Sequence, residues 1–259
     1  MLTEGTEGPN GKLGGNPEKE PARKIRPNRR SVTGLYLTRT GEKMYFESQL
    51  ERDTYLILDF EPSVRNLSSQ PMLVQNWYPD ALVSTKESEI VVDIKYGSDI
   101  VANWPDLSIR FAALEKQCEA QGYAYGVTTE SQVYWPENHR VGMLKWIEHI
   151  GRTCGDDIAI NLGRRISEVI EADGPATVLE IARRVASKPD LNSTISGVSS
   201  LLVNGTKFGV STPSNNLLDC KLFLSESQQE PLFSSRVIAC EDLREWVRTY
   251  PNGTIRRLN

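Results

Sequence analysis

The stretch EIVVDIKYG, residues 89–97, restricts most strongly what this chain can fold into. Its apolar residues alternate with a period of two, as they do in a β-strand whose two faces differ. Ile90, Val92 and Ile94 then share one face, while Asp93 and Lys95 lie with Val91 on the other. An acid and a lysine so close to a core are costly to bury unless they are paired. The stretch therefore predicts a sheet strand that ends in a polar cluster.

A second strand is expected just upstream, in WYPDALV at 77–83. Asp80 stands at its head, and the turn-like segment STKESE at 84–89 leads into the strand that contains Asp93. Two strands joined by so short a connection pair as a hairpin. We expect this hairpin to bring Asp80 near Asp93.

An amphipathic helix is expected at 47–59. At 100° per residue, its apolar stripe is formed by Phe46, Leu50, Thr54 and Ile57, and it is widened by Tyr55 and Leu58. Glu47 falls inside that stripe, and Glu51 falls between Leu58 and Tyr55. A charged carboxylate that faces a core is strongly destabilising unless something pairs with it. We therefore expect Glu51 to face a polar pocket.

These acids have the chemistry of a metal site. Carboxylate oxygens are the ligands that Mg²⁺ prefers, so Glu51, Asp80 and Asp93 are predicted to bind Mg²⁺ or Mn²⁺. The ion would polarise a phosphodiester and lower the pKa of an attacking water. Lys95 would orient that water or stabilise the charge that develops on the phosphate. A hairpin with an ordinary surface Asp–Lys pair is the alternative.

The order of these motifs is typical of metal-dependent phosphodiesterases of the restriction-endonuclease type. It also resembles one family, TnsA, the endonuclease subunit of heteromeric bacterial cut-and-paste transposases. The resemblance spans about residues 34–225. It lies in E-S-x-L-E at 47–51, Q-P at 70–71, P-D at 79–80, D-x-K at 93–95 and T-E at 129–130.

The resemblance implies that Glu51, Asp80, Asp93 and Lys95 are the catalytic residues, with Glu47 outside that set. The sequence departs from the family at Asp93, where a longer acid or an amide is common. It departs again after Lys95, where proline often follows and this chain has Tyr96.

The family's division of labour implies an activity and two partners. This chain would cleave the 5′ strands at transposon ends in the bacterial cytoplasm, and a separate integrase-like transposase subunit would cut and join the 3′ ends. A AAA+ ATPase would contact the C-terminal region. A stand-alone restriction or repair endonuclease, or a non-enzymatic winged-helix adaptor, are the alternatives.

The expected fold class is α/β, with three regions along the chain. Residues 1–33 should form a disordered arm. Residues 34–151 should form a restriction-endonuclease-like mixed sheet flanked by helices, which include one at about 107–121. Residues 152–259 should form a winged-helix domain with a terminal tail, because three short helices precede a strand pair. The possible helix at 239–250 is expected to pack on that same domain.

The charges of the outer regions bear on DNA binding. The basic stretch at 22–30 is either a solvated tail or an arm that binds phosphates. The third C-terminal helix, within 191–205, contains no Arg or Lys. Base readout in the major groove commonly uses such side chains, so protein docking or weak backbone contact is favoured for this domain.

Composition excludes several other classes. The net charge of −4 argues against indiscriminate nucleic-acid binding. No apolar run approaches 18 residues, so no membrane span or secretory signal is expected. The four cysteines are far apart and form no C-x-x-C pair, and there are only two histidines. Reduced structural thiols are therefore expected rather than disulfides or a zinc site.

Overall fold

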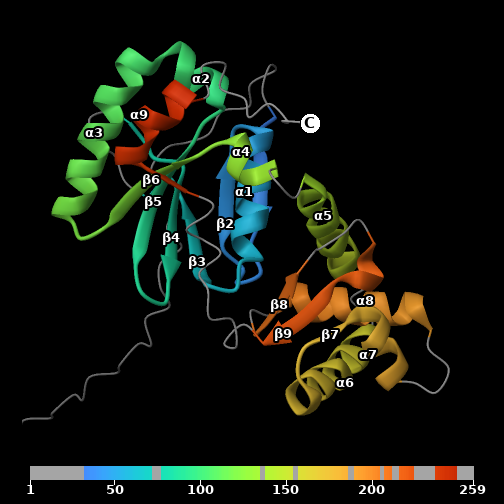
Figure 1. Cartoon of the computed structure of the whole chain (residues 1–259). Helices are drawn as coiled ribbons and strands as arrows, with labels where there is room; N and C mark the ends of the chain where they lie inside the picture. The colour runs from blue at the N-terminus through green and yellow to red at the C-terminus, as the bar shows by residue number, and fades with distance from the viewer. Residues whose placement is uncertain are drawn as a thin grey trace, which may run out of the picture.

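The computed structural model describes residues 32–71, 77–134, 138–153, 157–185, 190–204, 207–211, 216–224 and 237–249. At its centre is a five-stranded sheet with the strand order β10-β6-β5-β4-β3 (Figure 1). Only β5 and β6 pair in parallel, and the other neighbours are antiparallel. The strands are β3 (Val64–Ser69), β4 (Ala81–Thr85), β5 (Glu89–Ile94), β6 (Ala124–Thr128) and β10 (Ile238–Ala239).

Helices cover both faces of this sheet, so the fold is mixed α/β as predicted (Figure 1). Val91 packs on one side with α3 and α9, whereas Val92 packs on the other side with α1. The alternation predicted for β5 is therefore confirmed, and both of its faces are buried. The helices around the sheet are α1 (Gln49–Asp59), α2 (Gly97–Ala102), α3 (Trp104–Ala120), α4 (Glu130–Tyr134) and α9 (Cys240–Thr249).

A separate two-stranded ribbon, β1 (Gly34–Leu37) and β2 (Lys43–Phe46), precedes α1. Its inner side chains are buried in the core on the α1 side of the sheet. Ser48 then caps α1 and fixes its start two residues later than the sequence pattern indicated. The expected arm at 1–33 lies almost entirely outside the described residues.

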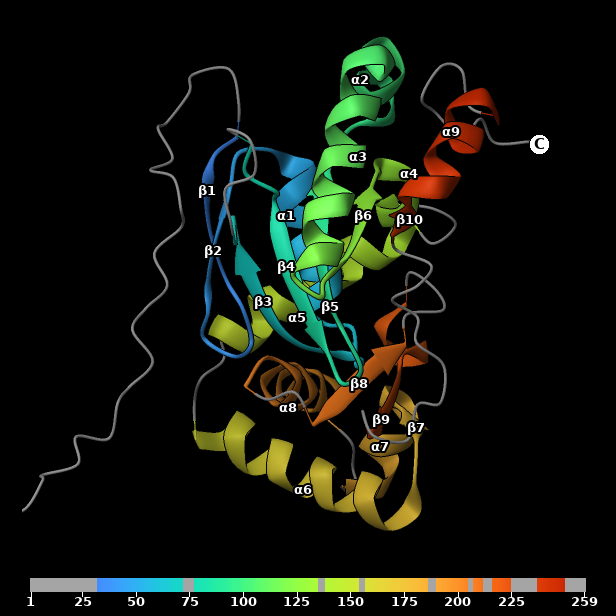
Figure 2. The ribbon, with the colours of Figure 1, turned by 90° about the vertical axis from the view of Figure 1, so that its left-hand side faces the viewer.

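The second half of the chain forms a smaller helical unit beside the sheet (Figure 2). Its three strands form one small antiparallel sheet, in the order β7-β9-β8. The predicted order of three helices followed by two strands is thus present, with one further short strand between the first two helices. The elements are α6 (Asp157–Asp173), β7 (Ala176–Thr177), α7 (Val178–Val185), α8 (Leu191–Val203), β8 (Phe208–Ser211), a 3₁₀ turn (Leu217–Asp219) and β9 (Lys221–Leu224).

The helix α5 (Asn138–Thr153) joins the two halves, because it packs against both α1 and α8. At Gly151 the two helices approach so closely that an added Cβ would lie 2.4 Å from the carbonyl oxygen of Ser199. Apolar residues of both halves belong to one continuous core. Packing therefore makes the boundary predicted near residue 151 a shared interface.

Three buried acids lie on α1 or just after it, and each is paired with at least one cation. Asp53 lies 2.7 Å from the ammonium of Lys145. Asp59 accepts hydrogen bonds from the backbone N–H of Arg39, whose guanidinium also lies against it. Glu61 lies 3.4 Å from the guanidinium of Arg140.

One predicted packing arrangement is wrong. The helix expected at 239–250 was predicted to pack on the C-terminal domain, but α9 lies against α3 and β6 of the main sheet. The preceding strand β10 pairs with β6 and forms the edge of that sheet. Val237 sits directly over Gly126, where an added Cβ would lie 2.1 Å from its methyl group. This close approach explains why glycine occupies the middle of β6.

None of the helices in the described parts of the chain is long and apolar enough to cross a membrane.

Candidate active site at the end of the central hairpin

The predicted hairpin is confirmed: β4 pairs with β5, with Ala81 opposite Val92. Asp80 precedes β4 and therefore lies at the same end of the sheet as Asp93. Its Oδ2 accepts a hydrogen bond of 2.6 Å from the backbone N–H of Ile94. The head of one strand is thus fixed to the end of the next.

Lys95 joins the two aspartates. Its ammonium lies 2.9 Å from Asp80 Oδ2 and 3.5 Å from Asp93 Oδ1. It also donates to the carbonyl oxygen of Ile94 at 3.1 Å. Burial disfavours the charged form, but the charges of Asp80 and Asp93 outweigh it and raise the pKa of Lys95. Lys95 is therefore a fixed cation near neutral pH, and its side chain remains 21% exposed.

Asp93 is fully buried, on the α3 side of the sheet. The indole N–H of Trp77 donates to both of its carboxylate oxygens, at 3.1 and 3.3 Å. The hydroxyl of Tyr125 donates to Oδ2 at 2.8 Å. Burial raises the pKa of Asp93, and the charge of Lys95 acts against that rise. Protein donors reach both carboxylate oxygens of Asp93, so a metal ion would share these oxygens with them, and the role of Asp93 as a metal ligand stays a prediction.

Glu51 reaches the same end of the sheet from α1. It takes part in capping the helix with Ser48: the Ser48 hydroxyl donates to Glu51 Oε1 at 2.9 Å and accepts from the Glu51 N–H at 3.1 Å. The N–H of Glu47 donates to Oε2 at 2.8 Å. Helix capping thus partly explains why a carboxylate lies beside the apolar stripe of α1.

Capping does not remove the electrostatic cost of Glu51. Burial raises the pKa of its carboxyl to about 7, and the nearby charge of Asp80 adds to the rise. The hydrogen bonds from Glu47 and Ser48 and the charge of Lys95 only partly oppose it. Glu51 and Asp80 therefore repel each other in a partly buried place, which is where a bound cation would be stabilised.

Gln70 stands beside Asp80 in an unusual backbone conformation. Its φ of 47° makes it the one non-glycine residue with positive φ among the described residues. Its N–H donates to the carbonyl oxygen of Asp80 at 3.1 Å, so the two residues face each other at the end of the β3–β4 ladder. Only 7% of Gln70 is exposed, and its Oε1 has no hydrogen-bond partner within the described residues. A buried amide oxygen without a donor is costly and is often explained by function.

The site carries more negative than positive charge. Glu51, Asp80 and Asp93 supply three carboxylates, and Lys95 is the only cation paired with them in the described parts of the chain. Within those parts, no three His, Cys, Asp or Glu side chains converge tightly enough to hold one metal ion together. The other carboxylates near Lys95 are those of Asp80 and Glu51, and Gln70 meets Asp80 through its backbone N–H. Oxygen atoms and excess negative charge fit a hard divalent cation such as Mg²⁺.

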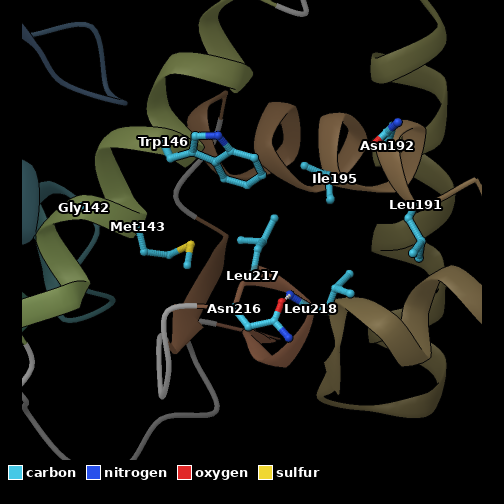
Figure 3. A pocket seen from close by; sticks show the side chains of 9 residues that line it. All are labelled: Gly142, Met143, Trp146, Leu191, Asn192, Ile195, Asn216, Leu217 and Leu218. Atoms are coloured by element: carbon cyan, nitrogen blue, oxygen red, sulfur yellow. Dashed lines mark hydrogen bonds between the residues drawn. The ribbon is translucent and has the colours of Figure 1, made fainter.

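A cavity of about 650 Å³ lies elsewhere, between α5, the start of α8 and the 3₁₀ turn. Figure 3 shows Met143 and Trp146 facing Ile195 and Leu217 across it. None of the nine described residues that line it is acidic, basic or a cysteine. The described lining of the cavity therefore offers no acid, base or thiol, and the end of the hairpin is the candidate active site.

Sequence reasoning found Glu51, Asp80, Asp93 and Lys95, and the structure brings all four to one end of the sheet. It missed Trp77 and Tyr125, which hold Asp93. The Trp77 indole precedes P-D by two residues, but nothing in the local pattern shows which way it turns. Comparison with known protein families finds no model that matches the chain, and comparison with curated proteins finds no match.

Proposed function

We propose that this chain is a metal-dependent DNA endonuclease whose active site lies at the end of the β4–β5 hairpin. The observation that carries the proposal is the meeting of Asp80, Asp93 and Lys95 there, with the Lys95 ammonium 2.9 Å from Asp80. Glu51 adds a carboxylate whose pKa is raised to about 7 by burial and by Asp80. Perturbed acids gathered around a fixed cation are typical of catalytic sites.

Each residue of the site has a separate role in this proposal. Asp80 and Glu51 would hold Mg²⁺ or Mn²⁺, and Gln70 offers a neutral oxygen beside Asp80. The bound ion would polarise the scissile phosphate and lower the pKa of the attacking water. Lys95 keeps its proton, so its ammonium can donate to a phosphate oxygen as negative charge develops there. Asp93 balances the Lys95 charge from the buried side.

The resemblance to TnsA supports a more specific role. We infer that the chain cleaves the 5′ strands at transposon ends, as one subunit of a heteromeric transposase. The 3′ strands would be cut and joined by an integrase-like subunit, and a AAA+ ATPase would bind the C-terminal region. In this reading the main sheet is a restriction-endonuclease-like fold, and the unit formed by α6 to β9 is a winged helix.

Surface charge in that second unit favours protein contact over base readout. Several of its basic side chains are paired with acids: Arg164 lies 2.7 Å from Glu168, and Lys207 lies 2.7 Å from Glu171. The helix α8 contains no Arg or Lys. A recognition helix without such donors has few means of reading base edges. We therefore propose that this unit binds a protein partner or the DNA backbone weakly.

Nicking of supercoiled plasmid by the purified full chain tests the proposal. We expect nicked circles with Mg²⁺ or Mn²⁺, none with EDTA, and none from Asp80→Asn with either metal. Glu89→Gln is the matched control, because Glu89 is an exposed acid at the opposite end of the same hairpin. Absence of metal-dependent nicking by the wild type would overturn the nuclease and favour the non-enzymatic adaptor.

A second measurement separates the transposase subunit from a stand-alone enzyme. A stand-alone nuclease should cleave both strands near its site without help. A transposase subunit should cleave only the 5′ strand at a transposon end, and its rate should rise when the integrase-like subunit is added. Strand-specific mapping of the cut ends on a labelled duplex distinguishes the two.

A further inference from the structure

Trp77 contacts both charged groups of β5. Its indole N–H donates to the two carboxylate oxygens of Asp93, at 3.1 and 3.3 Å. The ammonium of Lys95 lies 5.2 Å from the centre of the same ring. This distance falls within the range of cation–π attraction. One side chain therefore orients an acid through its edge and a cation through its π system.

Two further residues fix the indole and the acid. The guanidinium of Arg110, on α3, lies 4.9 Å from the centre of the Trp77 ring. Tyr125, on β6, donates to the second oxygen of Asp93 at 2.8 Å. Asp93 thus receives donors from two neighbouring segments, and Trp77 is braced from a third. Such surrounding contacts set the direction of an active-site group even though they do not touch the substrate.

The position of Lys95 depends on these contacts. Its side chain is long and has several rotatable bonds, so it would occupy many rotamers without support. Asp80 attracts the ammonium from one side at 2.9 Å, and Asp93 attracts it from the other at 3.5 Å. If Asp93 turned, Lys95 would lose one of its two acidic partners. The indole N–H is what prevents Asp93 from turning on the Trp77 side.

We propose that Trp77 is a positioning residue, which holds Asp93 with its N–H and Lys95 with its ring so that the ammonium stays beside Asp80. This inference rests on the proposed nuclease function. It assigns Asp93 to Lys95 rather than to the metal ion. It also explains how a short acid can serve at this position, because Asp93 has to reach only Lys95.

Trp77→Phe is the informative change, because it keeps an aromatic face near Lys95 and removes the indole N–H together with the five-membered part of the ring. We expect kcat for plasmid nicking to fall about 10- to 100-fold, as is usual when an orienting hydrogen bond is lost. KM for DNA should not change, because Trp77 acts through Lys95. Trp104→Phe is the matched control: Trp104 packs in the same apolar cluster, and among the described residues no acid accepts a hydrogen bond from it.

Measuring Trp77→Phe in a chain that also lacks Lys95 distinguishes a positioning role of Trp77 from a role in packing. In a Lys95→Ala chain, Trp77→Phe should cause no further loss, because the group that it positions is gone. A structural role would lower the rate by the same factor in both backgrounds. An independent readout needs no activity: the indole ¹H–¹⁵N signal that disappears in Trp77→Phe should shift in Asp93→Asn and stay in place in Glu89→Gln.

The outcomes are distinct. A wild type that does not nick overturns the proposed function and this inference with it. A wild type that nicks while Trp77→Phe keeps its full kcat overturns this inference alone. Equal losses in the wild-type and Lys95→Ala backgrounds, or an indole signal that ignores Asp93→Asn, also overturn it. Loss of kcat that vanishes without Lys95 supports it.

Discussion

Two groups of buried acids in this molecule differ in how far nearby cations balance their negative charge. On α1 and just after it, Asp53, Asp59 and Glu61 are each paired with at least one cation. At the end of the hairpin, Asp80 and Asp93 share Lys95, and Glu51 adds a third acid whose charge acts on Lys95 without an ion pair. Both groups include a residue of α1, so the helix carries one acid of each kind within three positions, Glu51 and Asp53.

The comparison teaches that burial of an acid is a poor sign of function by itself. Asp53 is 2% exposed, which is less than Glu51, yet Lys145 neutralises it. What distinguishes the hairpin end is the unmatched charge. A protein gains nothing in stability from unmatched buried charge, so such charge points to a missing cation or substrate.

The largest expected change is in stability, on removal of the cation that pairs with Asp59. Arg39→Leu should lower the free energy of unfolding by about 3–5 kcal/mol, because it leaves the buried Asp59 without its cation. It also removes the guanidinium that donates to the carbonyl oxygen of Leu202 at the end of α8. Denaturant unfolding measures the loss. A change below about 1 kcal/mol would show that the paired acids do not need matching, and the comparison would fail.

The next effect is on rate rather than stability. Lys95→Ala should slow nicking about 10²–10³-fold, because a fixed donor to the developing phosphate charge is lost. The folded state should persist, as a thermal melt can show. With the integrase-like subunit present, 3′ joining should continue and leave products attached through uncut 5′ strands. Lys86→Ala, at the exposed turn of the same hairpin, is the control and should cleave normally. Simple insertions at the wild-type frequency from Lys95→Ala would remove Lys95 from the mechanism.

Metal binding should also distinguish the acids at the end of the hairpin from the paired acids of α1. We expect millimolar Mg²⁺ to stabilise the wild type by roughly 1–3 kcal/mol, because an ion that binds only the folded chain shifts its unfolding equilibrium. Asp80→Asn should lose that gain, whereas Asp53→Asn should keep it, since Asp53 is already neutralised. Calorimetric titration with Mn²⁺ gives the affinity directly. Equal binding by Asp80→Asn and the wild type would place the ion elsewhere.

The smallest effect concerns pH and Glu51 without metal. Its folded pKa, raised from 4.5 to about 7, means that the folded state holds this proton more tightly than the unfolded state. The contribution of Glu51 to the free energy of unfolding of the wild type is therefore complete below about pH 4.5, and it is lost as the pH rises through 7. Glu51→Gln should escape that loss and be about 1 kcal/mol more stable than the wild type at pH 8. Unfolding in EDTA at pH 5 and pH 8 measures it, and a variant that is less stable at both would mean that capping outweighs charge.

Much of the site could be predicted because its signals are local. The alternation around Asp93 and Lys95 and the short link from Asp80 fix a hairpin without any distant contact. The acid–lysine pairing follows from that register. The start of α1 was two residues off, because Ser48 decides where the helix begins and the apolar stripe does not.

The other features of the site and the fold could not be predicted, because they depend on contacts between segments that are far apart in the sequence. The bond from Trp77 to Asp93 requires the indole to turn into the α3 side of the sheet, and Tyr125 comes from a strand 32 positions away. The positive φ of Gln70 has no sequence signal of the kind that a glycine gives. The strand β10 is only two residues long and pairs with β6 across more than a hundred positions. No periodic pattern can reveal so short a strand.

The return of β10 to the main sheet has a practical consequence for dividing the protein. The chain leaves the sheet at α5 and completes it only at Ile238, so the sheet is assembled from two ends of the sequence. A fragment that stops at 151 would lack its edge strand and expose the side of α3 that Leu243 and Trp246 cover. An uncovered strand edge beside an apolar patch invites aggregation. Replacing the stretch between α5 and β10 with a linker would keep this edge strand on the main sheet, whereas truncation would remove it, although either change uncovers the face of α5 that packs on α8.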